Sequence, residues 1–344
     1  MSRKSKKFSL GKLKHDYLVN LISDLEIDDE RVILGSKIGE DAAVVNIPGD
    51  NYLVVKTDPI TFATDQIGYY VVNINVNDIV CTGAKPKWFQ STILLPEDST
   101  TSALIENIFR DIHKTCQSMG IAVIGGHTEI TPNLDRPIVI GSLLGEVEKE
   151  NLILTSGAEP GDALILTKGI FIEGTSIIAR EKENELIRKN LDFEFIERCK
   201  GFLFNPGISV YKEANIATSN FKIKSLHDPT EGGVATGIAE MTIASNTGVI
   251  LEREKIDNSI LPEASKLSKI FDIDPMGTIS SGSLLIAIND EFYGELIDLL
   301  RKNNIYAEKV GYFVNKDKGL NIREVDGSFN PLFYSETDEI TKLF

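Results

Sequence analysis

The sequence predicts an α/β or α+β protein made of two domains, and three observations lead to this prediction. The chain has 344 residues, 42% hydrophobic and 25% charged, which suits two globular cores. Through the first half, apolar strand-like segments alternate with helical ones. Near residue 155 the pattern restarts with the turn-rich stretch TSGAEPGD and a strong strand. We therefore expect an arm over residues 1–14, an N-terminal domain over 15–154 and a C-terminal domain over 155–344.

The first half is expected to contain five strands and two helices. The strands are apolar segments bounded by turn residues: AAVVNI, YLVVKTD, KWFQSTILL, AVIGGHTE and IVIGSLLGEV. One helix, from Ser102 to Met119, has an apolar residue at every fourth position up to Cys116, whose expected role is core packing.

The other helix, within VNINVNDIVCTG, is expected to be amphipathic. Val72, Val76 and Val80 can face a core, whereas Asn75 and Asp78 share one stripe. Burying an unpaired carboxylate costs several kcal/mol. Asp78 is therefore solvent-exposed, which is the commoner case, or it is paired or bound to a metal.

In the second half, the strand in DALILT precedes a helix from Ile172 to Arg180 and a charged helical region from Glu181 to Lys200. A further helix is expected to begin near Gly233. The strand SLLIAIN, the helix FYGELIDLLRKN and the strand AEKVGYFV then form a unit that can close a sheet.

The composition excludes several classes of protein. The net charge is −15, so the body repels nucleic-acid backbones, although residues 1–14 hold six Lys or Arg and form a basic, solubilising arm. Cys81, Cys116 and Cys199 lack CxxC spacing, which argues against a disulfide framework or a structural zinc site and fits a reducing, cytoplasmic setting. No run approaches the ~18 apolar residues that a membrane span needs.

Four acidic motifs lie at the ends of expected strands or helices. IGEDAAVV places Asp41 before a strand, and VVKTDP places Asp58 after one. NVND ends in Asp78, and HDPTEGG contains Asp228. We expect these acids to converge. Like charges brought together need a cation, and magnesium binds one or two carboxylates together with phosphate oxygens and water.

Two glycine pairs are candidate phosphate cradles. Gly125 and Gly126 follow the apolar segment AVI, and their N–H groups can approach an anion because no Cβ intervenes. Thr230 precedes a second pair at the expected start of a helix, where free N–H groups favour phosphate. A plain turn is the commoner interpretation of a glycine pair. Neither a P-loop nor a GxGxxG fingerprint occurs, which disfavours the two common nucleotide-binding folds.

In their order and spacing, GEDAAVV, KTDPITF, NVNDIVCTGAKP, GGHTE and HDPTEGG resemble the AIR-synthase-related superfamily. This superfamily contains aminoimidazole ribonucleotide synthetase, thiamine-monophosphate kinase, selenophosphate synthetase and the hydrogenase-maturation protein HypE. The resemblance covers nearly the whole chain beyond residue 14 and is greatest to the archaeal HypE-like branch. It implies an N-terminal sheet that forms a shared barrel in a homodimer, a C-terminal α/β domain, and ATP between the two domains.

The resemblance also implies roles for individual residues. Magnesium on the ATP phosphates would be held by Asp41, Asp58, Asp78 and Asp228. The nucleotide would be contacted by Gly39, Thr57, Asn77, Gly125, Gly126, His127, Thr128 and Thr230. His227 and Glu129 are the candidate catalytic residues, with His227 acting as acid, base or phosphate contact. His127 is as well suited to packing as to a phosphate contact.

Several features depart from the patterns of these families. HypE ends in a cysteine that is the modified group, whereas this chain ends EITKLF. HypE also has a Ser-Glu-Gly stretch, and its counterpart here is Ser280, Ser281 and Gly282. Thiamine-monophosphate kinase has Asp in place of His127. Selenophosphate synthetase has a reactive N-terminal Cys or Sec, which Lys4 to Leu10 lacks.

We therefore predict a magnesium-dependent, ATP-using, homodimeric enzyme that activates an amide, carbamoyl or phosphate-type acceptor by phosphoryl transfer. A hydrogenase-maturation protein is a candidate partner, and we expect no nucleic-acid or membrane partner. One alternative is a non-catalytic nucleotide-binding partner in hydrogenase maturation, which Ser281 and the missing terminal cysteine favour. Another is a small-molecule kinase similar to thiamine-monophosphate kinase. The intact aspartates favour an enzyme.

Overall fold

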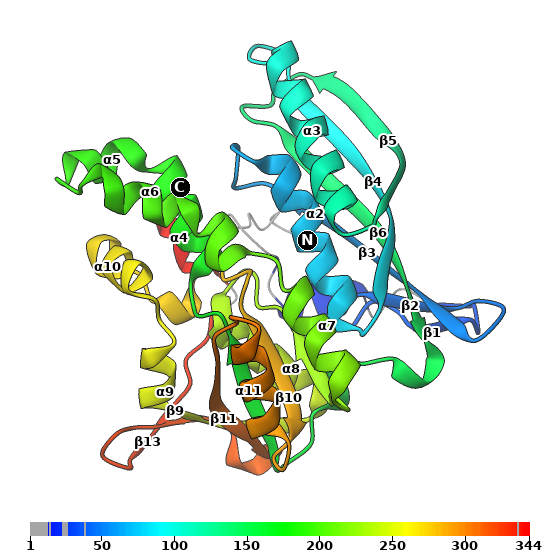
Figure 1. Ribbon diagram of the computed structural model, residues 1–344, viewed down its shortest axis with the longest axis vertical. Coiled ribbons are helices and arrows are strands. Elements are labelled where there is room, and N and C mark those ends of the chain that lie inside the picture. The colour runs from blue at the N-terminus through cyan, green and yellow to red at the C-terminus, as the bar shows by residue number, and fades with distance from the viewer. Residues whose placement is uncertain (1–12, 14, 23–26, 38, 336) are drawn as a thin grey trace, which may run out of the picture.

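A computed structural model of the chain describes residues 13, 15–22, 27–37, 39–335 and 337–344 (Figure 1). The expected basic arm, residues 1–14, lies outside the described residues apart from Leu13. Within the described ranges, no helix is both long enough and apolar enough to cross a lipid bilayer.

The first half of the chain forms one six-stranded sheet with two long helices packed on one face (Figure 1). Its strand order is β1-β2-β3-β6-β4-β5, and only β4 and β5 pair in parallel within it. The strands are β1 (Val32–Leu34), β2 (Ala43–Asn46), β3 (Asn51–Ile60), β4 (Lys85–Pro96), β5 (Ala122–Thr131) and β6 (Ile138–Glu148). The helices are α1 (His15–Ile22), α2 (Ile67–Cys81) and α3 (Ser102–Ser118). All five strands and both helices predicted here are present, and β1 and α1 are additional.

Helix α2 is buried on all sides, so the prediction that it is amphipathic was wrong. Every residue of α2 except Tyr69 is buried. One face packs on the sheet, where a Cβ on Gly141 of β6 would lie 2.4 Å from the Asn75 amide nitrogen. The opposite face meets the second domain, which the helical periodicity of one segment does not reveal. The exposed alternative for Asp78 was wrong for the same reason, because its side chain is about 5% exposed.

The second half forms a seven-stranded sheet in the order β13-β12-β9-β11-β7-β10-β8. Its strands are β7 (Asp162–Thr167), β8 (Ser225–His227), β9 (Thr247–Glu252), β10 (Leu284–Asn289), β11 (Ala307–Asn315), β12 (Leu320–Arg323) and β13 (Phe329–Pro331). All residues of β7 are buried, which explains its unbroken apolar sequence. Residues 149–161 connect the two sheets, and the domain boundary near residue 155 stays a prediction.

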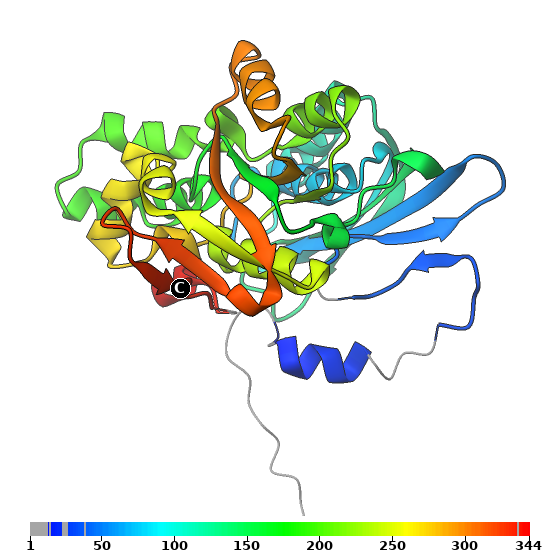
Figure 2. The ribbon, with the colours of Figure 1, turned by 90° about the horizontal axis from the view of Figure 1, so that it is seen from below.

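Eight helices surround this second sheet in the described part of the chain (Figures 1 and 2). They are α4 (Ile172–Glu181), α5 (Glu183–Arg188), α6 (Phe193–Gly201), α7 (Tyr211–Asn220), α8 (Gly233–Ser245), α9 (Arg253–Asn258), α10 (Pro262–Phe271) and α11 (Tyr293–Lys302). The expected charged helical region is thus two separate helices, α5 and α6. The expected helices near 172, 233 and 293 are present, whereas α7, α9 and α10 were not predicted.

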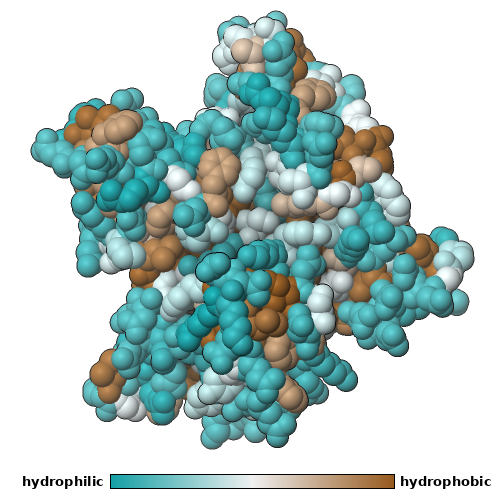
Figure 3. Space-filling view, in the orientation of Figure 1, coloured by the Kyte–Doolittle hydropathy of each residue, from teal (hydrophilic) through white to brown (hydrophobic). Residues whose placement is uncertain are grey.

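Strand β5 lies at the edge of the first sheet and is exposed along nearly its whole length. Among its apolar side chains, Val123, Ile124 and Ile130 are 45%, 56% and 58% exposed. Hydrophobic surface gathers along this outer side of the upper domain in Figure 3. A long apolar edge strand of this kind is a surface on which another chain can pair.

Candidate functional site

The candidate site is a cavity of about 290 Å³ to which both domains contribute. From the first domain, its lining includes parts of β3 and α2 and the segment before β2. From the second domain, it includes the segment after β8, the helices α4 and α8, and the segment before β10. The elements that carry the four predicted acids therefore meet at one place.

The four acids predicted to converge all line this cavity. Asp41 precedes β2, Asp58 lies in β3, Asp78 lies in the last turn of α2, and Asp228 follows β8 directly. Asp58 is the most exposed, with 29% of its side chain accessible, whereas Asp78 and Asp228 are almost fully buried. The structure thus brings together carboxylates that lie up to 187 positions apart in the sequence, by the difference between 228 and 41.

Lys56 is a cation that pairs with two acids of this cluster, and it was not among the residues predicted from the sequence. Its Nζ atom lies 3.1 Å from Asp78 Oδ1 and 3.3 Å from Asp58 Oδ2. Residues 56 and 58 share one face of β3 because side chains alternate along a strand. Burial alone would lower the pKa of Lys56, but the surrounding carboxylates raise it, so the ammonium stays charged.

His227 is held between two carboxylates. Its Nδ1 atom lies 2.7 Å from Asp41 Oδ1, and its Nε2 atom lies 3.0 Å from Glu240 Oε2. Burial opposes the charged form, yet the two acids raise the pKa of His227 well above its ordinary value. Both ring nitrogens thus face a carboxylate, and this arrangement is suited to positioning Asp41.

Two carboxylate oxygens of the cluster have no hydrogen-bond partner in the part of the chain that the structure describes. Burial, together with the neighbouring acids, raises the pKa of Asp78 and of Asp228 well above the ordinary value. Asp78 Oδ2 and Asp228 Oδ2 are buried and have no hydrogen-bond partner among the described residues. A bound dication would favour the ionised form of both acids and supply the missing partner of each oxygen, so the donor set fits magnesium.

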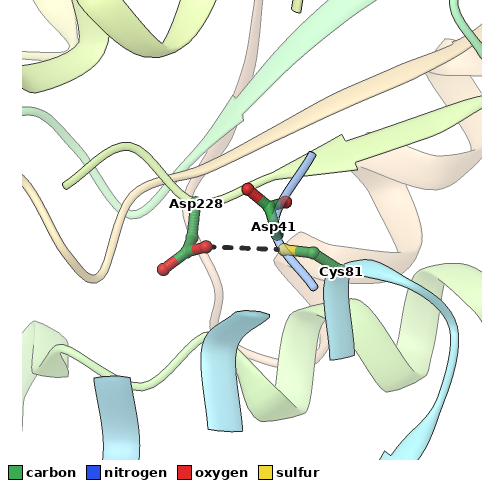
Figure 4. Close-up of side chains that lie close together, drawn as sticks. All are labelled: Asp41, Cys81 and Asp228. Atoms are coloured by element: carbon green, nitrogen blue, oxygen red, sulfur yellow. Dashed lines mark hydrogen bonds between the residues drawn. The ribbon is translucent and has the colours of Figure 1, made fainter. Parts of the chain in front are cut away.

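Cys81 completes the group, but as a thiol (Figure 4). One ligand atom each from Asp41, Cys81 and Asp228 lies within 4.8 Å of the others. Cys81 Sγ is 3.9 Å from Asp228 Oδ1 and donates a weak hydrogen bond to it. Burial and the three aspartates raise the pKa of Cys81 well above its ordinary value. A protonated thiol is a poor metal ligand and a poor nucleophile, so the oxygens are the better ligands.

The GGHTE motif lies away from this cavity within one chain. Gly125, Gly126, His127, Thr128 and Glu129 are on the exposed edge strand β5, and the cavity lining contains none of them. His127 Nε2 and Glu129 Oε2 pair with each other at 3.0 Å on the surface. A Cβ on Gly126 would lie 2.2 Å from Ser91 O, so this glycine is required by the close approach of β4 and β5.

Two other predicted nucleotide contacts also point elsewhere. Thr57 follows Lys56 in β3 and is exposed on the opposite face of the sheet, where its hydroxyl donates to Gly141 O. Asn77 is fully buried and joins the two domains. Its amide donates to Ile208 O at 2.9 Å and accepts from Val210 N at 2.9 Å.

Gly39 and Thr230 do line the cavity. Gly39 has φ 82°, and a Cβ there would lie 2.8 Å from Glu240 O, so glycine permits this close approach to α8. At the start of α8, the N–H group of Gly232 donates to Asp338 Oδ2 at 2.6 Å. The second predicted phosphate cradle therefore has one of its N–H groups occupied by a carboxylate from the C-terminal segment.

Sequence reasoning missed Lys56, Glu240 and Glu173 at this site. Lys56 could have been found, because it lies two positions before Asp58 and so shares its face of the strand. Glu240 and Glu173 lie within helices of the second domain, and no local pattern marks them as buried.

The fold and the cavity define a class: a two-domain α/β protein with a buried carboxylate cluster between its domains. The chain belongs to the AIR synthase related family, with residues 39–147 matching the N-terminal domain and residues 159–321 matching the C-terminal domain of that family.

Three curated relatives illustrate the range of the family. A hydrogenase expression/formation protein of Methanocaldococcus jannaschii is 28% identical over 325 residues, covering 92% of each chain. A selenide, water dikinase of Peptoclostridium acidaminophilum is 30% identical and covers 74% of this chain and 67% of its own. A carbamoyl dehydratase HypE of Cupriavidus necator is 25% identical and covers 72% of this chain and 68% of its own. The last two names are those of enzymes.

Solved structures show the same fold. HypE in complex with ATP matches with a TM-score of 0.67 at 20% identity, covering 96% of this chain and 98% of that one. AaThiL complexed with AMPPCP and TMP matches with a TM-score of 0.70 at 18% identity, covering 94% and 97%. A chain of the HypE–HypF complex matches with a TM-score of 0.70 at 20% identity, covering 92% of this chain and 99% of that one.

Proposed function

We propose that the protein is a magnesium-dependent enzyme that uses ATP to activate an acceptor by phosphoryl transfer. The single observation that carries this proposal is a pair of buried carboxylate oxygens, Asp78 Oδ2 and Asp228 Oδ2, that find no partner within the described ranges. A magnesium ion bound there would neutralise the phosphate charge that develops during transfer. Two structures with this fold, one bound to ATP and one bound to AMPPCP, support ATP as the nucleotide.

Some residues of the site would bind the magnesium ion, and others would hold those ligands in position. Asp41, Asp58, Asp78 and Asp228 would hold magnesium. Lys56 would keep Asp58 and Asp78 in place and lies where it can approach a phosphate oxygen. His227 would position Asp41, to which it is already bound through Nδ1. Catalysis of this kind depends on positioning and on charge stabilisation.

The acceptor is proposed to carry an amide, carbamoyl or phosphate-type oxygen. The carbamoyl dehydratase among the relatives supports the first two, and the selenide, water dikinase supports phosphoryl transfer in general. A thiamine-monophosphate-kinase-like activity is the second candidate, because AaThiL has the same fold.

We also propose that the enzyme is a homodimer formed through the first sheet. The exposed apolar edge strand β5 supports this, as does the GGHTE motif that it carries away from the cavity of its own chain. A cytoplasmic location and a partner in hydrogenase maturation belong to the same proposal. The similarity to a hydrogenase expression/formation protein and to HypE bound to HypF supports the latter.

The experiment is a measurement of ADP formation from ATP with magnesium, alone and with candidate acceptors that carry amide, carbamoyl or phosphate groups. We expect turnover that EDTA abolishes and that Asp228→Asn lowers at least tenfold. The control is Asp98→Asn, because Asp98 is exposed and lies outside the cavity lining. Turnover that Asp228→Asn leaves unchanged would contradict the proposed site, and ATP binding without turnover for any acceptor would favour a non-catalytic nucleotide-binding partner.

A further inference from the structure

A further buried carboxyl group, that of Glu173, lines the same cavity at its C-terminal-domain side. Glu173 lies in the first turn of α4 and is 3% exposed. Its Oε2 atom accepts a hydrogen bond from Ser281 N at 3.3 Å. No Lys, Arg or His of the described ranges forms an ion pair with it. Buried carboxyl groups are normally paired, so the lack of a cation at this position requires an explanation.

The serine run beside Glu173 contains an unsatisfied hydroxyl. Ser280 Oγ and Ser283 Oγ bond to each other at 2.7 Å, and Ser283 Oγ also donates to Gly169 O at 2.6 Å. Ser281 Oγ is fully buried, lies close to Glu173 and has no well-aligned hydrogen-bond partner among the described residues. Of the three hydroxyls, Ser281 alone belongs to the cavity lining.

Part of the cavity wall is apolar. Ile177 lies one helical turn after Glu173, and Ile279 precedes Ser281 by two residues; both line the cavity. The segment that carries Ser281 is held rigidly against α4, since Gly174 N donates to Ile279 O at 3.1 Å and Phe171 N donates to Ser280 Oγ at 2.8 Å. The two polar groups are therefore held in place in a cavity that also offers apolar side chains, as in many small-molecule sites.

We propose that Glu173 and Ser281 form the acceptor-binding subsite of the cavity and that this subsite binds a cationic nitrogen group, such as an ammonium or amidinium. An anionic acceptor group would be repelled, because Glu231 lines the cavity nearby and both Glu231 and Asp338 add negative charge around Glu173. A cationic nitrogen would supply the missing partner of Glu173 and donate a second hydrogen bond to Ser281 Oγ. The role of the bound cation as the acceptor rests on the proposed function, whereas its binding to Glu173 and Ser281 does not.

Binding of a cation to Glu173 has a measurable consequence. Burial raises the pKa of Glu173 to about 8, against the lowering effect of its contacts with Ser281, so the free carboxyl is mostly protonated at pH 7. The other titratable groups near it are Glu231, Asp338 and Tyr70. An alkylammonium keeps its own proton at this pH, and pairing with it would ionise Glu173. We therefore expect release of about 0.9 proton per bound amine at pH 7.

The test uses three probes of similar shape: isobutylamine, isobutyramide and isobutyrate, which are cationic, neutral and anionic. Calorimetry in buffers of different ionisation enthalpy measures binding and proton release together, with the full-length protein. We expect isobutylamine to bind at least tenfold more tightly than the other two and to release protons. Equal binding of all three, preference for the amide or the anion, or amine binding without proton release would overturn the proposal.

Variants separate this subsite from a merely structural role. Glu173→Gln should lower the affinity for isobutylamine at least tenfold and abolish proton release, while the affinity for magnesium–ATP changes less than threefold. Ser281→Ala should lower the affinity for isobutylamine several-fold and retain proton release. This variant still tests the proposal if Glu173→Gln does not fold. The matched control is Glu97→Gln, which removes an exposed acid outside the cavity lining and should leave amine binding and proton release intact. Amine binding without any magnesium–ATP binding would refute the proposed function and leave the subsite standing.

Discussion

Replacing Asn77 by alanine tests how the two domains are held together. The Asn77 side chain bonds Ile208 O and Val210 N, each at 2.9 Å, and all of these groups are buried. Alanine would leave a carbonyl oxygen and an N–H group of the second domain without partners. Each unsatisfied buried group costs about 1–3 kcal/mol, so we expect the free energy of unfolding to fall by about 3 kcal/mol.

The assay is urea unfolding followed by far-UV circular dichroism, combined with ATP titration in magnesium. The matched control is Asn73→Ala, one turn earlier on the same helix. Among the described residues, the Asn73 side chain makes one hydrogen bond, to Tyr69 O of its own helix, and its Oδ1 atom has no partner there. Its loss should therefore cost no more than about 1 kcal/mol. We expect ATP affinity to change less than threefold in both variants. A tenfold loss of ATP affinity in Asn77→Ala with unchanged stability would refute this reasoning and make Asn77 a nucleotide contact.

Three further predictions follow from the structure. Lys56→Gln should lower the free energy of unfolding by about 2 kcal/mol in EDTA, because Asp58 and Asp78 lose their shared cation. Magnesium should restore most of the lost stability. Equal losses with and without magnesium would contradict the proposal that a metal ion can neutralise these two acids. The pKa of Glu173 is about 8 in the folded state against 4.5 when exposed. Between pH 4.5 and 8 the folded state therefore binds one proton more than the unfolded state. The free energy of unfolding that this carboxyl contributes should thus fall as the pH rises from 4.5 to 8. Glu173→Gln should remove that slope and raise the free energy of unfolding by on the order of 3 kcal/mol at pH 7; denaturation curves with the same pH slope in both proteins would show the shift to be absent. Gly126→Ala places a Cβ 2.2 Å from Ser91 O, so it should separate β4 from β5 and give monomers in light scattering. Gly125→Ala is the matched control, because Gly125 has a similar positive φ but open space around it, and this variant should remain dimeric. Identical behaviour of the two variants would contradict the role of β5.

Much of the fold was predictable because the relevant signals are local. The five main strands of the first sheet are apolar runs bounded by turns, and each is present. The surroundings of α2 were not predictable, since its second face is covered by a domain that begins some 80 residues later in the sequence. The short strands β12 and β13 at the sheet edge were missed because they carry few buried residues.

The acids of the candidate site could be predicted from their positions at the ends of strands and helices. Asp41, Asp58, Asp78 and Asp228 do line one cavity. Their partners could not be predicted equally well, because Glu240 and Glu173 reach the cavity from helices in the second domain. The GGHTE motif marks a strand whose glycine is needed for close strand packing, and its role in binding depends on the proposed second chain.

The account rests on the claim that the buried carboxylates bind ATP through magnesium, and calorimetric titration of ATP tests this most directly. We expect ATP to bind in the presence of magnesium and to lose affinity at least a hundredfold in EDTA. Asp78→Asn should weaken binding at least tenfold, which corresponds to about 1.4 kcal/mol, with an unchanged circular dichroism spectrum, and Asp98→Asn should bind as the original protein does. ATP binding that is equally tight in EDTA, or that Asp78→Asn leaves unchanged, would contradict the account.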